Sequence, residues 1–192
     1  MELSNGFSIE RHGSAMVIRF TRPEIRNPLS ITVVESLVNA LGMLKNESAI
    51  VFTGSEDAFA SGADLREIAD VNGSTAAGFA RRGQELMNAI AGSNATTIAA
   101  VNGYCFGGAL DLALACNTRI ASRNAEFCHP GAGLGIMTGW GGTQRLPRLI
   151  GEAAALEMFM TGKRVLAAEA KRLGLVEGIV DDPVAVAIAP YL

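Results

Sequence analysis

Residues 101–111 read VNGYCFGGALD, and this stretch decides the expected fold. The apolar run that leads into it, residues 98–101, has the composition of a buried parallel strand. Gly107 and Gly108 then open a segment, residues 107–115, that we expect to be a helix because its apolar run begins directly after the glycine turn. A buried strand that passes through a tight glycine turn into a helix is the repeating unit of a parallel α/β fold.

The same alternation continues on both sides of this stretch. Alternating apolar and polar residues at 7–11 and 15–20, around His12 and Gly13, predict a hairpin at the start of the chain. Further strands are expected at residues 49–53 and 119–121, and further helices at residues 32–45, 78–90, 142–149 and 153–159, with a helix entering a short strand over 166–180. We therefore expect an α/β fold, with a mostly parallel sheet, right-handed crossovers and flanking helices.

Composition favours a single globular domain that binds a small ligand. The 192 residues include 49% hydrophobic and 18% charged side chains, and no linker divides them, so we expect one domain over residues 1–192. A net charge of −3 without a long basic run gives no electrostatic support to nucleic-acid binding. The first ten residues do not resemble a signal peptide, and no apolar run approaches the ~20 residues that span a membrane. We expect a cytoplasmic protein that has no membrane partner.

The three cysteines are expected to be reduced and buried. Cys105, Cys116 and Cys128 lie in apolar stretches, and their spacing fits neither a metal site nor a disulfide framework. None has a neighbour in sequence that would obviously lower its pKa, so a packing role is favoured over a nucleophilic one. Trp140 and Tyr104 are likewise expected in the core or in a pocket wall.

Two glycine-rich turns carry the chemistry that the sequence suggests. The first, residues 58–67, reads AFASGADLRE; Asp64 and Glu67 resemble a capping box, so a helix should begin at Leu65 and leave N–H groups near Ala63 free. The second turn brings a helix N-terminus without bulky side chains to Gly108. Amides at a helix N-terminus favour an oxygen that gains negative charge during a reaction. The alternative is that the small residues are structural.

Several motifs occur together and resemble one known family. They are FASGADLRE at 59–67, AAVNGYCFGGALDLALACN at 99–117, AEF at 125–127, GGTQRLPR at 141–148, the RP and NPL segments at 22–23 and 27–29, and LGLV at 173–176. Together they resemble the enoyl-CoA hydratase/isomerase, or crotonase, superfamily over nearly the whole chain. The resemblance implies a crotonase-like ββα spiral.

The resemblance also implies a ligand and a set of site residues. The N–H groups of Ala63 and Gly108 would form an oxyanion hole for the thioester carbonyl of an acyl-CoA. Coenzyme A would be part of this substrate, and neither a separate cofactor nor a metal is expected. The family pattern places Ala60, Asp64 and Leu65 against the CoA, whose phosphates would meet Arg22 and Arg26. For the two arginines, an ordinary solvated surface position remains the alternative.

The sequence departs from the family pattern at both catalytic acids. Hydratases of the family use two glutamates; this chain has Asp111 at the first position and Gly131 at the second. Losing one of two acids would remove something like 10²–10⁴-fold of a hydration rate. A proton shift or a decarboxylation through an enolate needs only the oxyanion hole and at most one acid or base. His129 is a possible substitute base, although a histidine here could also simply hydrogen-bond a turn.

Family members usually continue with further helices, so we expect that the chain lacks most of the usual C-terminal helical segment. Apolar surface left uncovered would favour a homo-oligomer, a trimer or hexamer by resemblance. Three functions remain open: an enolate-stabilising enzyme with Asp111 as its acid–base, a weak or ordinary hydratase, and a catalytically inactive acyl-CoA-binding or assembly subunit.

Overall fold

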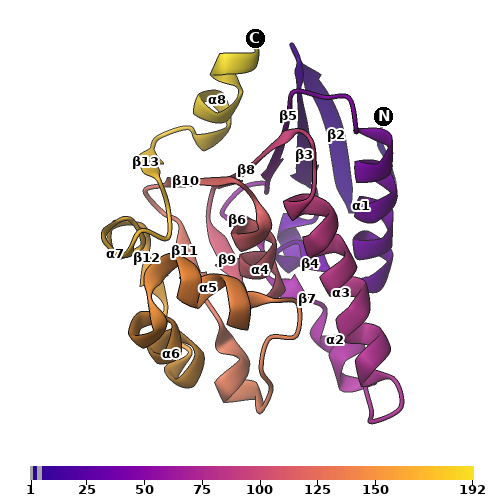
Figure 1. The fold of residues 1–192 in the computed structure, drawn as a ribbon, viewed down its shortest axis with the longest axis vertical. Helices are drawn as coiled ribbons and strands as arrows, with labels where there is room; N and C mark the ends of the chain where they lie inside the picture. The colour runs from indigo at the N-terminus through magenta and orange to yellow at the C-terminus, as the bar shows by residue number, and fades with distance from the viewer. Residues whose placement is uncertain (1, 4–5) are drawn as a thin grey trace.

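Among the described residues, 2–3 and 6–192 of the computed structural model, seven strands form the main sheet in the order β1-β2-β3-β5-β8-β10-β13 (Figure 1). The strands β1, β2 and β3 are antiparallel, and β3, β5, β8, β10 and β13 are parallel. Their bounds are Glu2–Leu3, Phe7–His12, Ala15–Phe20, Ala49–Thr53, Thr96–Val101, Thr118–Ser122 and Gly178–Val180. The predicted hairpin and the mostly parallel sheet are confirmed.

A second, smaller sheet was not predicted. It has the order β12-β11-β9-β6, with β6 at Ala58–Ala60, β9 at Tyr104–Phe106, β11 at Glu126–Cys128 and β12 at Val165–Leu166. A two-stranded pair adds β4, Pro28–Leu29, beside β7, Gly62–Ala63. Each of these strands has only two or three residues, which is too short to show the two-residue alternation that identifies a strand in sequence.

Helices flank the sheets (Figure 1). They are α1 Ile31–Met43, α2 Leu65–Ala69, α3 Ala76–Ala91, α4 Gly108–Ala115, α5 Gly142–Ile150, α6 Glu152–Thr161, α7 Ala167–Leu173 and α8 Pro183–Ile188, with 3-10 turns at Pro23–Ile25, Pro130–Leu134 and Ala189–Tyr191. The predicted helices are confirmed to within a few residues at their ends. In the described part of the chain, every helix is too short or too polar to cross a membrane.

Helix α8 was missed, because the apolar run that follows Pro183 is short and shows no helical spacing. It begins at the cap Asp182, whose side chain accepts the N–H groups of Val184 and Ala185 at 3.0 and 2.9 Å. Its buried residue Ala187 packs against Val17, Val51, Ile98 and Ala100 on one face of the main sheet. These sheet residues are therefore covered by a helix whose own apolar stripe is only one or two turns long.

Helix α4 lies at the centre of the main hydrophobic core. Every residue from Ala109 to Ala115 is buried, which explains its uniformly apolar sequence. It contacts α3, α5, β7 and β9, and so connects the core under the main sheet to the second sheet. Because α4 is enclosed on all sides, its N-terminal amides at Gly108 are held in a fixed position.

The C-terminal end of α4 is tied to the last strands by a buried arginine. Arg119 is 4% exposed; its Nη1 donates to the carbonyl of Cys116 at 2.9 Å and its Nε to that of Leu175 at 2.9 Å. Its Nη2 and its backbone N–H both donate to the carboxylate of Glu177, at 2.5 and 2.6 Å. One side chain thus joins α4, β10 and the segment that leads into β13.

Replacing this arginine should destabilise the fold. Arg119→Met removes the side-chain donors to the carbonyls of Ala113, Cys116 and Leu175 and to one carboxylate oxygen of Glu177, so we expect a loss of about 2–3 kcal/mol in the free energy of unfolding. Urea denaturation measures it. The matched control is Arg123→Met, because Arg123 pairs with Asp181 at 2.7 Å on the surface, with both side chains exposed. Equal stability of the two variants would contradict the bridging role of Arg119.

Candidate active site

The two glycine-rich turns of the sequence meet in space. A Cβ atom added at Gly62 would lie 2.7 Å from the backbone nitrogen of Gly108 and 2.6 Å from the carbonyl oxygen of Phe106. A Cβ atom added at Gly108 would lie 3.4 Å from the nitrogen of Ala63. Gly62 has a φ of +89°, so both its conformation and its contacts require glycine. The backbone segments at β7 and at the start of α4 are therefore in direct contact.

The amide of Gly108 has no acceptor within α4, because Gly108 is the first residue of the helix. The neighbouring amide of Gly107 is used, since it donates to the carbonyl of Cys128 at 2.8 Å. For Ala63 we infer the orientation from the register of β4 and β7. Pro28, opposite Gly62, has no N–H, so the donors of this short ladder are Gly62 and Leu29, and the Ala63 N–H points away. That the two amides bind one oxygen stays a prediction that this proximity supports.

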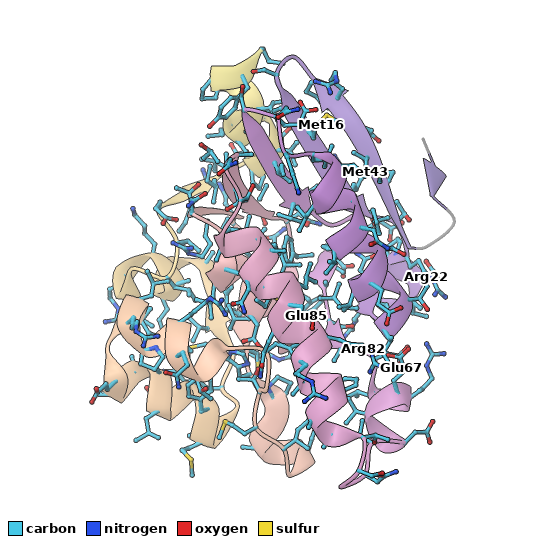
Figure 2. The ribbon with its side chains drawn as sticks, turned by 45° about the vertical axis from the view of Figure 1, so that its right-hand side comes forward. Met16, Arg22, Met43, Glu67, Arg82 and Glu85 are labelled. Atoms are coloured by element: carbon cyan, nitrogen blue, oxygen red, sulfur yellow. The ribbon has the colours of Figure 1, made fainter. Side chains whose placement is uncertain are left out.

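The capping box predicted for the first turn is only half present. Asp64 caps α2, accepting the Arg66 N–H at 2.9 Å, and the Arg66 guanidinium beside it holds the pKa of Asp64 below its usual range. Glu67, however, does not bond back to Asp64. Its carboxylate accepts the N–H of Ile31 at 2.8 Å, so it caps the neighbouring helix α1, near whose lower end Figure 2 labels it. The expectation was wrong for Glu67 because a free helix N-terminus lay within reach.

Beside the paired turns lies a cavity of about 380 Å³, named here the central cavity. It is lined from β7, α2, α3, the start of α4, the loop 129–140 and α6. The lining residues are Ser61, Ala63, Leu65, Ile68, Val71, Ala76, Phe79, Gly107, Gly108, His129, Pro130, Gly131, Ala132, Leu134, Ile136, Met137, Thr138, Trp140 and Phe159. No acidic side chain is among these lining residues of the described chain. The cavity is suited to an apolar chain that ends near the Ala63 and Gly108 amides.

Asp111 lies behind the wall of this cavity. Its side chain is fully enclosed; Thr138 donates its hydroxyl to Oδ2, and the backbone of Trp140 also bonds the carboxylate. The other oxygen, Oδ1, has no hydrogen-bond partner and lies 3.5 Å from Nε2 of His129, which is also buried and unpartnered. His129 lines the cavity, whereas Asp111 does not. The chain therefore brings the two predicted proton carriers together, with the histidine nearer to the cavity.

Burial shifts both groups of this pair. It raises the pKa of Asp111 to about 7, against the opposing effects of the Thr138 hydroxyl, Arg145 and the Trp140 amide. It lowers the pKa of His129 to about 4. At neutral pH the imidazole is therefore uncharged, and the carboxyl group is close to its midpoint. A carboxyl group near its midpoint at pH 7 can both accept and return a proton.

Gly131, which the resemblance places at the second family acid, lies in a loop that is built around its lack of a side chain. A Cβ atom there would lie 2.4 Å from the carbonyl oxygen of Ile136. The Ile136 N–H also donates to the Gly131 carbonyl at 2.9 Å, which closes the loop on itself. A glutamate at this position would require a different backbone path, so Gly131→Glu does not simply restore a missing acid.

The structure places the other predicted site residues less centrally. Ala60 is fully buried in β6, and Asp64 lies outside the cavity lining, whereas Leu65 lines the cavity and is 57% exposed. Arg26 stacks over the Tyr104 ring at 4.7 Å on the surface, and Arg22 lies 3.6 Å from Glu24. Whether these residues meet CoA stays a prediction. The three cysteines are buried, as expected.

Asn27 was missed as a structural residue of the site. It is buried and accepts the Arg22 N–H at 2.7 Å, and its side-chain amide donates to the carbonyls of Ala58 and Phe59. It thereby fixes the turn before β4 against β6, and so sets the position of the β4–β7 pair. The sequence did contain a sign of this role, because Asn27 lies in the NPL segment at 27–29. It did not show which groups Asn27 would contact.

Trp140 covers the start of α4. A Cβ atom at Gly108 would lie 2.5 Å from its six-membered ring, and one at Gly83 of α3 would lie 2.1 Å from its Cδ1. The Phe79 ring packs beside it at 5.9 Å between centroids. Trp140 is 5% exposed, so it is a wall of the central cavity, as expected, and two glycines make room for it.

Comparison with known proteins gives one family. The family model described as Enoyl-CoA hydratase/isomerase matches residues 10–187. A short-chain-enoyl-CoA hydratase of Clostridium acetobutylicum is 37% identical over 185 residues, covering 94% of this chain and 70% of that protein. A crotonyl-CoA hydratase of Syntrophomonas wolfei is 36% identical, covering 90% of this chain and 68% of the relative.

Solved structures of enoyl-CoA hydratases are also similar to this chain, in fold and in sequence. The enoyl-CoA hydratase of Bacillus anthracis superposes with a TM-score of 0.88 at 35% identity, covering 96% of this chain and 73% of that one. The enoyl-CoA hydratase of Thermoplasma volcanium superposes with a TM-score of 0.91 at 33% identity, covering 97% and 76%. The crotonase-like fold predicted from the motifs is thereby confirmed.

The packing of Trp140 can be tested through its own fluorescence, because it is the only tryptophan in the chain. Gly83→Ala should displace the indole, shift its emission and cost about 1–3 kcal/mol of stability by overpacking. The control is Gly78→Ala on the same helix, where an added Cβ meets nothing within 4 Å. That variant should keep the emission and gain about 0.5–1 kcal/mol from helix propensity. Unchanged emission in Gly83→Ala would contradict the packing described.

Proposed function

The chain belongs to the enoyl-CoA hydratase/isomerase family, and from this premise we propose that it is an enzyme that binds an acyl-CoA and stabilises its thioester enolate. The amides of Ala63 and Gly108 would hold the thioester oxygen, and the central cavity would take the acyl chain. Three features support this: the two amides lie on backbone segments in contact, one of them begins the buried helix α4, and the cavity beside them is mainly apolar.

Among the reactions of such an enolate, we propose an isomerisation that moves the double bond of an enoyl-CoA. The observation that carries this choice is that one enclosed carboxyl group, Asp111, serves a cavity without an acidic side chain in its described lining. Hydration needs a positioned water and a proton donor, a task that two acids share. Moving a double bond needs one group that removes a proton from one carbon and returns it to another. A decarboxylation would also need no second acid.

The alternative is an acyl-CoA-binding subunit without efficient catalysis. The enclosure of Asp111 favours it, because a carboxyl group behind the cavity wall does not reach a ligand directly. The two functions share the oxyanion hole and differ in turnover. Incubation with a 3-enoyl-CoA and with crotonyl-CoA, followed by the absorbance of the conjugated thioester, separates them: isomerisation raises it, hydration lowers it, and binding alone leaves it unchanged.

Turnover should depend on Asp111. Asp111→Asn keeps the shape of the side chain and removes its proton, so we expect kcat for the 3-enoyl-CoA to fall by about 10²-fold or more, with CoA-ester binding nearly unchanged. The control is Asp57→Asn, an exposed carboxylate that does not line the cavity, which should keep the activity. Full activity of Asp111→Asn would remove the acid–base role.

We also propose that the protein is a homo-oligomer, a trimer or a hexamer. Exposed apolar side chains on α6 and next to it support this: Leu156, Met160 and Leu166 are 60, 63 and 58% exposed. Light scattering should give three or six times the chain mass of 20.0 kDa. The double variant Leu156→Lys/Met160→Lys should lower that mass, whereas a wild-type monomer at micromolar concentration would exclude the proposal.

A further inference from the structure

His129 lies between Oδ1 of the enclosed Asp111 and the central cavity. The imidazole lines the cavity and packs against the Phe159 ring of α6 at 5.0 Å between centroids. Its Nε2 is the atom nearest to Asp111, 3.5 Å from Oδ1. Within the described chain its other nitrogen, Nδ1, has no hydrogen-bond partner and is not among the enclosed atoms. A proton that travels between Oδ1 of Asp111 and a ligand in the cavity therefore meets His129 on its way, whereas the Oδ2 side is occupied by the Thr138 hydroxyl.

The two enclosed atoms of the pair complement each other. Oδ1 of Asp111 and Nε2 of His129 are the buried side-chain atoms of the described residues that lack a hydrogen-bond partner. Buried polar atoms nearly always have a hydrogen-bond partner, so the lack of a partner at both atoms needs an explanation. One proton between them satisfies both atoms, whichever of the two carries it. Gly142 keeps this space open, since a Cβ atom there would lie within 2.1 Å of Oδ1 and 3.1 Å of the imidazole.

We propose that Asp111 and His129 share one proton, that His129 is the group that touches the substrate, and that Asp111 acts through it. When Nε2 carries the proton and donates to an ionised Asp111, Nδ1 is a base that faces the cavity. When Oδ1 carries the proton and donates to Nε2, Nδ1 carries a hydrogen instead. The inference rests on the proposed acyl-CoA function for its substrate, but the sharing of the proton does not depend on it.

For a 3-enoyl-CoA the step balances with this pair alone. Nδ1 takes the proton from the carbon next to the thioester while Nε2 passes its own proton to Oδ1, and the electron pair of the broken C–H bond enters the dienolate. The Ala63 and Gly108 amides would hold the negative oxygen. Nδ1 then returns its proton to the far carbon of the former double bond as Oδ1 returns one to Nε2. The product is the conjugated 2-enoyl-CoA, without water or any other reactant.

The surroundings of the pair favour a neutral imidazole and a proton on the carboxyl group. Asp111 faces the positive charge of Arg145 on α5 and the hydroxyl of Thr138, and it interacts electrostatically with the buried thiol of Cys105, whose pKa is raised mainly by burial. His129 has Phe159 beside it and no charged neighbour except Asp111 among the described contacts. Since burial lowers the pKa of His129 to about 4 and raises that of Asp111 to about 7, the pair should change from two protons to one near neutral pH and keep the proton between Oδ1 and Nε2.

Nitrogen NMR of the imidazole tests the pair without substrate. The chain has two histidines, so His12→Gln leaves His129 as the only source of ring ¹⁵N signals. Between pH 5 and 9 the two ring signals should exchange donor and acceptor character with a midpoint near 7. Adding Asp111→Asn should remove this change. Ring signals that stay constant in the His12→Gln protein, or that still change with Asp111→Asn present, would overturn the shared proton.

Enzyme kinetics test whether His129 contacts the substrate and Asp111 acts through it. His129→Gln should lower kcat for the 3-enoyl-CoA by about 10²-fold, and His129→Gln/Asp111→Asn should be no slower than either single variant, because the two act as a unit. The wild-type kcat/KM should rise with pH to a plateau above about 7, and the rise should be absent in both single variants. Undiminished activity of His129→Gln, or losses that multiply in the double variant, would overturn the role of His129. A wild type without turnover would refute the proposed function and leave the NMR result to decide the pair.

Discussion

The close contact between two backbone segments, at Gly62–Ala63 and at Gly107–Gly108, is the constraint on which the rest of the site depends. Neither segment can carry a side chain at the contact, since a Cβ atom at Gly62 would lie 2.7 Å from the Gly108 nitrogen. The buried helix α4 fixes one segment, and the β4–β7 pair, which Asn27 anchors to β6, fixes the other. Two amides held by such different elements cannot move apart without disturbing the core, which is the preorganisation that stabilisation of a developing charge requires.

The sequence predicted the elements whose pattern repeats and missed those that depend on a distant partner. Strand β5 was predicted to the residue because its five residues form one continuous, mainly apolar run, and α1, α3 and α6 were predicted to within a few residues because they are long enough to show an apolar pattern. The strands of the second sheet and helix α8 are too short to show such a pattern. Glu67 caps α1 rather than its own helix, a choice that depends on where the N–H of Ile31 lies in space. Local patterns contain no such information, so these features became visible only in the fold.

The sequence predicted which residues form the candidate site but not how deeply each of them is buried. The motifs gave Ala63, Gly108, Asp111 and His129, and the structure brings all four to one region. They did not show that Asp111 is enclosed or that His129 lies between it and the cavity, because burial is set by Trp140, Thr138 and the loop around them. Nor did they show that Gly131 is required by the carbonyl of Ile136. A glycine at position 131 is thus part of the loop's own packing.

An enclosed carboxyl group is costly, and the structure compensates for that cost only in part. The Thr138 hydroxyl and the Trp140 amide serve one oxygen of Asp111, and the other oxygen faces an imidazole that burial keeps uncharged. Full compensation, by an arginine for example, would hold the carboxyl group ionised and useless for returning a proton at neutral pH. Leaving it without any partner would keep it protonated and unable to accept one. A neutral histidine at 3.5 Å is the intermediate case, because it can donate to the ionised form and accept from the protonated one. A site with one carboxyl group can in this way both take and return a proton, which a reaction that moves a proton between two carbons requires and hydration by two separate acids does not.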